Sequence, residues 1–145
     1  MANDQPNFLL SLQALLDLCA SDTNPATVWA DGVDSDRLRV AHLTIAQAKA
    51  AILRCTDQGQ RTRLTAKLSA LLASLQADGG SPLSFGLGHA DVWQALLHEP
   101  TIAQMPQVDR QLYAIAMHEG LLVVEYGHVY TAALVKLSVQ LRTLN

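Results

Sequence analysis

Apolar residues recur three and four positions apart through the first half of the chain, which is typical of amphipathic helices. The spacing predicts one helix from about Pro6 to Ala20, a second from about Ser35 to Cys55 and a third from about Gln60 to Ala77. Residues 21–34 are rich in Asp, Asn, Pro and Gly and predict a loop. We expect the second and third helices to pair as an antiparallel hairpin, with the first helix against them or against a symmetry mate.

Residues 79–88 carry four glycines and one proline, which favours a linker. The stretch has no GxxxxGK[ST] pattern, so it does not predict a phosphate-binding loop. We therefore expect three parts: a helical part over residues 1–78, this linker, and a second part over residues 89–145.

The second part begins with three short helical patterns, the last of which starts at Asp109 and is stopped by Gly120. An apolar strand follows, and Gly127 permits a tight hairpin after it. Residues 132–143 fit either a helix or a strand, and we favour a final helix from about Ala132.

The segment TIAQMPQVDRQLYAIA, residues 101–116, resembles a helix-turn-helix, with Ala103 at the small position where the two helices touch. EGLLVV and the Tyr126-Gly127-His128 turn are similar to the first strand and tip of a wing. The whole resembles the winged helix-turn-helix superfamily over about residues 89–131, although Pro106 and Gln107 stand where a glycine usually turns the chain. The resemblance implies a mainly α fold: an N-terminal helical hairpin or bundle, a winged-helix-like part of three short helices plus a β-hairpin, and a C-terminal helix.

Charge is strongly segregated along the chain. Residues 1–36 hold six acidic and no basic side chains, whereas residues 37–67 hold seven basic side chains against Asp57 alone. Such asymmetry marks an anion-binding face, or acidic and basic segments that face each other within the chain or across a dimer. We favour the second reading. Because no apolar run approaches the ~18 residues of a membrane span and Cys19 and Cys55 sit in helical apolar patterns, we expect a cytoplasmic protein without membrane contact.

The winged-helix resemblance implies residues that would face a partner, on the recognition helix and on the wing. The recognition-helix candidates are Arg110, Gln111, Tyr113 and Ala114, and the wing candidates are Tyr126 and His128. Arg110 is the only Lys or Arg between His89 and Thr131, so the positive charge that grips DNA phosphates is missing there. DNA binding would depend on the basic face formed by Arg61, Arg63 and Lys67.

We therefore favour a non-enzymatic adaptor or regulator that acts by protein–protein contact. The alternative is a dimeric, sequence-specific DNA-binding transcriptional regulator, joined through its N-terminal helices. The five histidines show no HxxxH or HExxH spacing. A metal site from His118, Glu119 and His128 is conceivable but not favoured, so we expect no catalytic residue, metal or cofactor.

Overall fold

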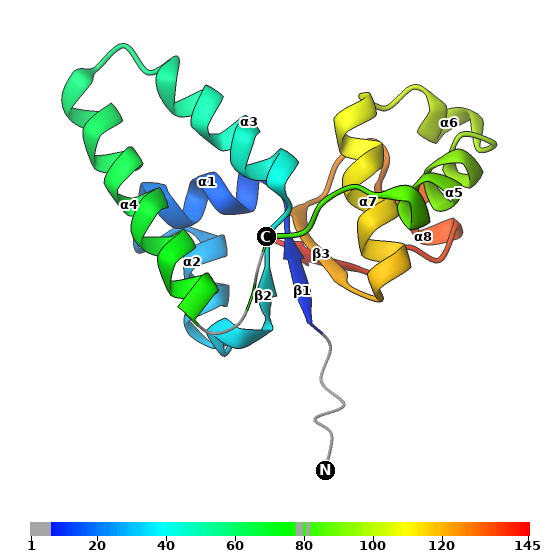
Figure 1. Ribbon diagram of the computed structural model, residues 1–145, viewed down its shortest axis with the longest axis horizontal. Coiled ribbons are helices and arrows are strands. Elements are labelled where there is room, and N and C mark those ends of the chain that lie inside the picture. The colour runs from blue at the N-terminus through cyan, green and yellow to red at the C-terminus, as the bar shows by residue number, and fades with distance from the viewer. Residues whose placement is uncertain (1–6, 78–79, 81) are drawn as a thin grey trace.

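The molecule is built on a four-stranded parallel sheet, in the order β2-β1-β3-β4 (Figure 1). The structure, a computed structural model, describes residues 7–77, 80 and 82–145. The strands are β1 (Phe8–Leu10), β2 (Leu38–Arg39), β3 (Leu122–Tyr126) and β4 (Leu141–Leu144). The expectation of a mainly α fold is therefore wrong, and the architecture is α/β.

Register shows why β1 is central to the sheet. Phe8 is opposite Leu38 on one side and Leu122 on the other, and Leu9 is opposite Arg39 and Val123. All three residues of β1 are buried, as expected for a strand covered on both faces, where the apolar run is continuous and does not alternate. Backbone pairing continues one residue further, because the Ser11 amide donates to the Val124 carbonyl at 3.1 Å.

Two groups of helices cover the two faces of the sheet (Figure 1). The first group is α1 (Leu12–Ala20), α2 (Pro25–Asp31), α3 (His42–Leu53) and α4 (Gln58–Ala77), with a short 3-10 turn at Ser35–Arg37. The second group is α5 (Leu87–Leu96), α6 (Pro100–Ala103), α7 (Gln107–Glu119) and α8 (Thr131–Lys136). No helix among the described residues is long and apolar enough to cross a membrane.

Each face of the sheet has its own apolar core, and neighbouring strand residues contribute to opposite cores. Leu10 and Val124 belong to the core beneath the first helical group, whereas Leu9 and Val123 belong to the core beneath the second. This alternation is the two-residue period of a strand, which points successive side chains to opposite faces. The fold is thus three layers: helices, sheet, helices.

Several expected elements differ in kind from those in the structure. The segment expected as a helix from Pro6 begins as strand β1, and Pro6 itself lies outside the described residues, as do residues 79 and 81 of the expected linker. The expected loop at 21–34 contains α2, in which the Asn24 side chain accepts from the Thr27 amide at 3.0 Å and caps the first turn. The helix expected from Ser35 begins only at His42, because Leu38 and Arg39 are taken into the sheet.

The winged hairpin is absent from the described chain. β3 lies where the first wing strand was expected, but it pairs in parallel with β1 and β4, and the chain after Gly127 enters α8. Residues 132–143 are neither all helix nor all strand, since α8 is followed by β4. Gly120 does end α7 as expected, in the left-handed conformation with φ of 70°. The division at 1–78, 79–88 and 89–145 stays a prediction, and the sheet takes strands from both sides of it.

We predict that Leu9→Ala lowers the free energy of unfolding by about 2–5 kcal/mol, because it opens a cavity where the side chain is 0% exposed. Leu53→Ala is the matched control, since Leu53 is 73% exposed and its truncation should change stability by no more than about 0.5 kcal/mol. Urea unfolding measures both. Equal losses in the two variants would contradict the placement of β1 in the core.

Candidate active site at the carboxyl ends of the parallel strands

The strand order creates a crevice beside β1. The chain adds β2 on one side of β1 and then adds β3 and β4 on the other side. The strand order therefore reverses between β1 and β3, which makes this position a topological switch point. In open parallel sheets, ligands bind outside the carboxyl ends of the strands at such a switch point. We therefore expect the residues that follow β1 and β3 to line a ligand-binding site.

A hollow of about 330 Å³ opens at this place. It receives residues from the turn after β1, the end of β3, and the facing sides of α3 and α7. The lining residues are Ser11, Leu12, Gln13, Gln47, Asp109, Leu112, Glu125, Tyr126, Gly127 and His128.

Glu125, at the end of β3, is the buried acid of this hollow. The side chain is 5% exposed, and its Oε2 accepts from the Tyr113 hydroxyl and lies 2.8 Å from His128 Nε2. His128 Nδ1 accepts the Tyr130 amide at 3.1 Å, which in an uncharged imidazole places the proton on Nε2, facing Glu125. Two donors therefore converge on one carboxylate oxygen. The other oxygen, Oε1, is buried without a hydrogen-bond partner among the described residues.

Tyr113 is held as a donor by its surroundings. Burial raises the pKa of its hydroxyl well above the usual range, and the charge and hydrogen bond of Glu125 raise it further, with a smaller contribution from the Asp109 charge. Tyr113 thus stays protonated and fixes the Glu125 side chain without neutralising it.

Asp109 is the second acid. It lies in the first turn of α7, where a negative charge is favoured by the helix dipole. Burial nevertheless raises the pKa of its carboxyl, and the nearby His128 partly opposes that rise. Two carboxylates line this half-buried hollow, and its lining holds no Lys or Arg. A bound positive charge would therefore stabilise the site.

A single hard divalent cation would supply this positive charge. Mg²⁺ is commonly held by one or two carboxylates together with substrate phosphates and water. Asp109 and Glu125 supply the carboxylates, and the unpartnered Glu125 Oε1 is an available oxygen ligand. Ser11 and Gln47 add neutral oxygens to the lining.

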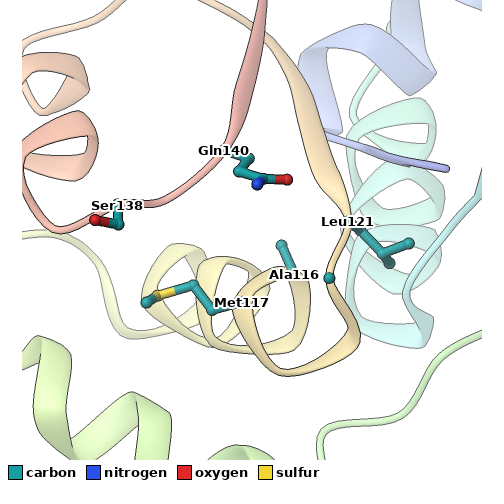
Figure 2. Close-up of a pocket in the computed structure, with 6 residues that line it drawn as sticks. Ala116, Met117, Leu121, Ser138 and Gln140 are labelled. Carbon is teal, nitrogen blue, oxygen red and sulfur yellow. The ribbon is translucent and has the colours of Figure 1, made fainter. Parts of the chain in front are cut away.

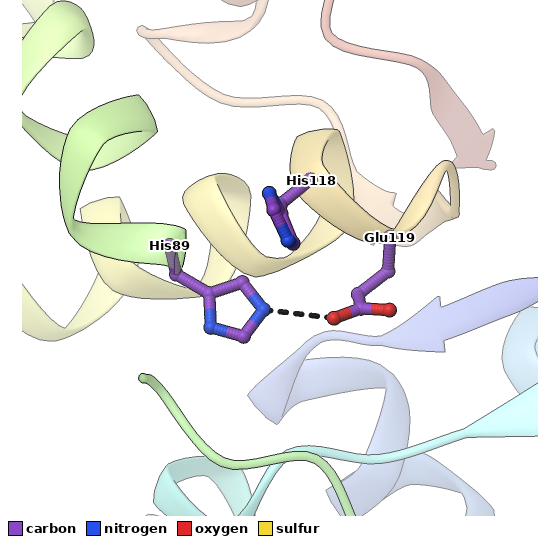
Figure 3. Close-up of side chains that lie close together, drawn as sticks. All are labelled: His89, His118 and Glu119. Atoms are coloured by element: carbon purple, nitrogen blue, oxygen red, sulfur yellow. Dashed lines mark hydrogen bonds and ion pairs between the residues drawn. The ribbon is translucent and has the colours of Figure 1, made fainter. Parts of the chain in front are cut away.

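A separate cluster of His89, His118 and Glu119 brings one ligand atom from each side chain to within 4.8 Å of the others (Figure 3). The hydrogen bonds of His89 count against a metal there. Its Nδ1 accepts the Gly86 amide at 2.9 Å, so an uncharged ring carries its proton on Nε2, which donates to Glu119 Oε1 at 2.9 Å. A histidine that binds a metal through Nε2 instead donates from Nδ1.

This cluster fastens two helices together. His89 caps the start of α5 and reaches Glu119 at the end of α7, and their packing is close: a β-carbon at Gly88 would lie 3.0 Å from His118 Nε2. The fold also divides the metal set that was conceivable but not favoured, because His128 lies with Glu125 and not with His118 and Glu119.

Another hollow, of about 200 Å³, has no titratable side chain in its lining (Figure 2). It is lined by Ala116, Met117, Gly120, Leu121, Ser138 and Gln140. Leu121 and Gln140 immediately precede β3 and β4, so the hollow lies at the amino ends of these strands, away from Asp109 and Glu125. It therefore offers no titratable acid or base.

The recognition-helix candidates are distributed through α7 and do not share an exposed face. Arg110 Nη1 donates to the carbonyls of Ala103 and Met105 at 2.7 and 2.8 Å, so it closes the preceding turn. Gln111 is partly buried, while Tyr113 and Ala114 are buried. Of the wing candidates, Tyr126 donates to Asp17 Oδ2 at 2.6 Å, and His128 lines the candidate site.

The basic-face candidates all lie on α4, in the helical group on the other side of the sheet from α7 (Figure 1). Arg61 Nη1 donates to the Cys55 carbonyl at 3.0 Å, and Lys67 Nζ lies 3.5 Å from Asp22 Oδ1. One acid–base contact thus joins the acidic and basic segments within the chain. An anion-binding role for Arg61, Arg63 and Lys67 stays a prediction.

Sequence reasoning missed Ser11, Gln47, Asp109 and Glu125 as members of one site. In the sequence, Asp109 marks the start of a helix and Glu125 follows an apolar run, and neither residue stands out as part of a site. The available signal was a polar residue directly after each apolar strand, Ser11 after FLL and Glu125 after LLVV. Without recognising parallel strands, this signal has no meaning, because only parallel strands bring such positions to one edge.

Solved structures of toxin–antitoxin proteins share this fold at low sequence identity. FitAcB from Neisseria gonorrhoeae is 15% identical with a TM-score of 0.71, over 92% of this chain and 95% of that chain. VapBC2 from Rickettsia felis, bound to a DNA fragment from its promoter, is 10% identical with a TM-score of 0.68, over 95% and 98%. VapBC-5 from Mycobacterium tuberculosis, of the VapBC family of toxin–antitoxin systems, is 17% identical with a TM-score of 0.70, over 96% and 99%.

No protein-family model matches this chain, and the comparison with curated proteins gives no match. The structural likenesses and the parallel sheet together identify a PIN-like α/β fold. The winged-helix resemblance is therefore wrong. The expectation of an adaptor or DNA-binding regulator built on a winged helix is wrong with it, and the same structural likenesses contradict the expectation of a non-enzymatic protein.

Asp109→Asn should stabilise the protein at neutral pH. Burial raises the pKa of the Asp109 carboxyl in the folded state above its unfolded pKa, which is ordinarily 3.8. The carboxyl therefore contributes its full stability below the unfolded pKa, and this contribution is lost as pH rises through the folded pKa. Urea unfolding at about pH 7 should show the variant more stable than the wild type, and at about pH 3 the two should agree. Asp91→Asn, at an exposed position on α5, should show no such difference. A gain of equal size at both pH values would contradict the assignment.

His89→Ala should lower the free energy of unfolding by about 1–3 kcal/mol, because it leaves the Gly86 amide and Glu119 without their partner. Zn²⁺ should change the melting temperature of the wild type and of His89→Ala by the same amount, since only a metal bound by His89 would raise that of the wild type alone. Thermal unfolding with and without Zn²⁺ measures both effects, with His98→Ala as the control at an exposed histidine. A zinc-dependent rise that disappears in His89→Ala would show a metal site here.

Proposed function

We propose that this chain is the toxin-type nuclease of a toxin–antitoxin pair and hydrolyses phosphodiester bonds of RNA in the cytoplasm. The observation that carries the proposal is the carboxylate pair, Asp109 and Glu125, in the hollow at the switch point of the sheet. The fold supports it, because toxins with this PIN-like fold are ribonucleases. The likeness spans at least 92% of the chain, so no second domain is needed to account for it.

The hollow also suits a phosphate. Ser11, Leu12 and Gln13 line it, and they form the N-cap and first two residues of α1. The first amides of a helix have no acceptor within it, and the dipole there favours anions. The Ser11 hydroxyl oxygen accepts the Ala14 amide at 3.3 Å, so its own proton is free to donate to a phosphate oxygen. A phosphate group would thus have donors on one side and the cation held by the carboxylates on the other.

The chain's own residues have distinct tasks in this reaction. Asp109 and Glu125 would hold Mg²⁺, which supplies Lewis acidity toward the phosphate and lowers the pKa of attacking water. Tyr113 and His128 fix Glu125 by its Oε2, which leaves Oε1 for the ion. The α1 amides and the Ser11 hydroxyl orient the phosphate, and Leu12 and Leu112 exclude water from part of the hollow.

A protein partner follows from the same proposal. The structural neighbours are toxin–antitoxin complexes, and one of them is bound to promoter DNA. We propose that this chain binds a cognate antitoxin and that any contact with promoter DNA is made by the pair. The placement of Arg61 and Lys67, both engaged within the chain, agrees with leaving DNA to the partner.

The purified chain should cleave single-stranded RNA in Mg²⁺ or Mn²⁺ and should not cleave it in EDTA. Asp109→Asn and Glu125→Gln should each lower the rate by about 10²-fold or more, by loss of a charged ligand from the site. Asp91→Asn removes an exposed acid of α5 and should cleave at the wild-type rate. Cleavage of labelled RNA is followed on denaturing gels.

No cleavage by the wild type with either ion would contradict the proposed function. Cleavage that survives Asp109→Asn unchanged would contradict the site, because the activity would then come from elsewhere in the chain or from a contaminating nuclease.

A further inference from the structure

A second hollow, of about 380 Å³, adjoins the candidate site along α3. It shares Leu12 and Gln47 with that site, so the two hollows are adjacent. Its lining residues are Leu12, Leu43, Ala46, Gln47, Ala50, Ala51, Arg54 and Val108. We refer to these residues as the α3 groove.

Small side chains create the groove. Ala46, Ala50 and Ala51 lie on neighbouring turns of α3, and their methyl groups leave space that longer side chains would fill. Leu12 and Val108 close the floor from α1 and α7, where Val108 immediately precedes Asp109. The floor of the groove is apolar. The volume of the whole groove falls within the range of pockets that hold small ligands, about 300–1,000 Å³.

Arg54 is the charged residue at the far end of the groove. It is exposed, and no hydrogen bond or ion pair engages its guanidinium within the described chain. Other cations are engaged: Arg61 with Cys55, Lys67 with Asp22, and Arg110 with two carbonyls. A guanidinium presents a planar fork of donors that matches two phosphate oxygens.

The distance between Gln47 and Arg54 along α3 indicates which phosphate of a bound strand Arg54 would bind. Gln47, at the shared end of the two hollows, precedes Arg54 by seven residues, which is about 10 Å along a helix. A stacked nucleic-acid strand rises about 3.4 Å per nucleotide. Arg54 is therefore placed for a phosphate further along the strand than the cleaved phosphate beside Asp109 and Glu125.

We propose that the α3 groove is a nucleotide subsite of the nuclease. It takes a nucleoside that flanks the cleaved bond, with the base on the floor formed by Ala46, Ala50 and Val108, and Arg54 binds a neighbouring phosphate of the same strand. The inference rests on the proposed function for its substrate class. Binding through one groove of this size selects single-stranded RNA over a duplex, because a paired base is not free to enter it.

RNA binding tests the subsite without depending on catalysis. The dissociation constant of a fluorescent RNA oligonucleotide is measured by anisotropy in EDTA, for the wild type, Arg54→Ala and Ala50→Leu. Each variant should raise the constant about 5- to 30-fold, the first by loss of a phosphate contact and the second by filling the groove. Arg54→Ala should also reduce the dependence on salt by about one phosphate contact. Arg142→Ala, at an exposed arginine of β4 outside the groove, should bind as the wild type does.

Arg54 also lies at the C-terminal end of α3, where a cation is favoured by the helix dipole. Unfolding of each variant in urea separates that role from RNA binding, since a purely structural arginine would lower stability and leave the affinity of the folded protein unchanged. Ala50→Leu keeps the charge, so a loss of affinity there identifies the groove itself.

The outcomes separate this inference from the proposed function. If both groove variants bind RNA with wild-type affinity, the subsite is overturned. If Asp109→Asn still abolishes cleavage in that case, the proposed nuclease activity is unaffected. Loss of affinity in both variants, without cleavage by the wild type, would support the groove as an RNA site and overturn the nuclease. An equal loss in Arg142→Ala would overturn the subsite, because it would show that RNA is attracted to any positive charge on the protein.

Discussion

Burial of β1 between two parallel neighbours is the constraint on which the rest of the structure depends. Three residues, Phe8 to Leu10, pair with both β2 and β3 and send side chains into both cores. A strand in this position must be apolar on both faces and must have its backbone groups satisfied from both sides. Because β2 and β3 come from distant parts of the chain, the sheet is complete only when both strands have paired with β1.

The location of the site follows from that constraint. Parallel strands bring their carboxyl ends to one edge, and the switch point beside β1 leaves a crevice there that neither helical layer fills. The crevice receives the start of α1 from one core and the start of α7 from the other. The same arrangement that buries Leu9 and Leu10 therefore delivers Ser11 and Glu125 to a shared hollow.

Helical periodicity predicts much of this chain, but not the feature that defines its fold. The helix ending at Gly120 and the long helix near Gln60 to Ala77 are readable from sequence, because each repeats its apolar spacing several times. β1 is three residues long, shorter than one helical turn, and FLL followed by α1 continues smoothly into the next apolar spacing. Pairing partners more than a hundred residues apart leave no trace in such a short run. The polar residues that end the strands were visible, but their meaning depends on the pairing.

The electrostatics of the hollow give the last reason to regard it as a site and not as ordinary core. An apolar residue at position 125 would pack at the end of β3 without the cost of burying a carboxylate. Glu125 instead uses two donors, Tyr113 and His128, on a single oxygen, and leaves Oε1 without a partner. Asp109 adds a second negative charge whose ionisation burial opposes. Two acids in one hollow whose lining holds no Lys or Arg destabilise the fold, and a bound cation with a phosphate would relieve that cost.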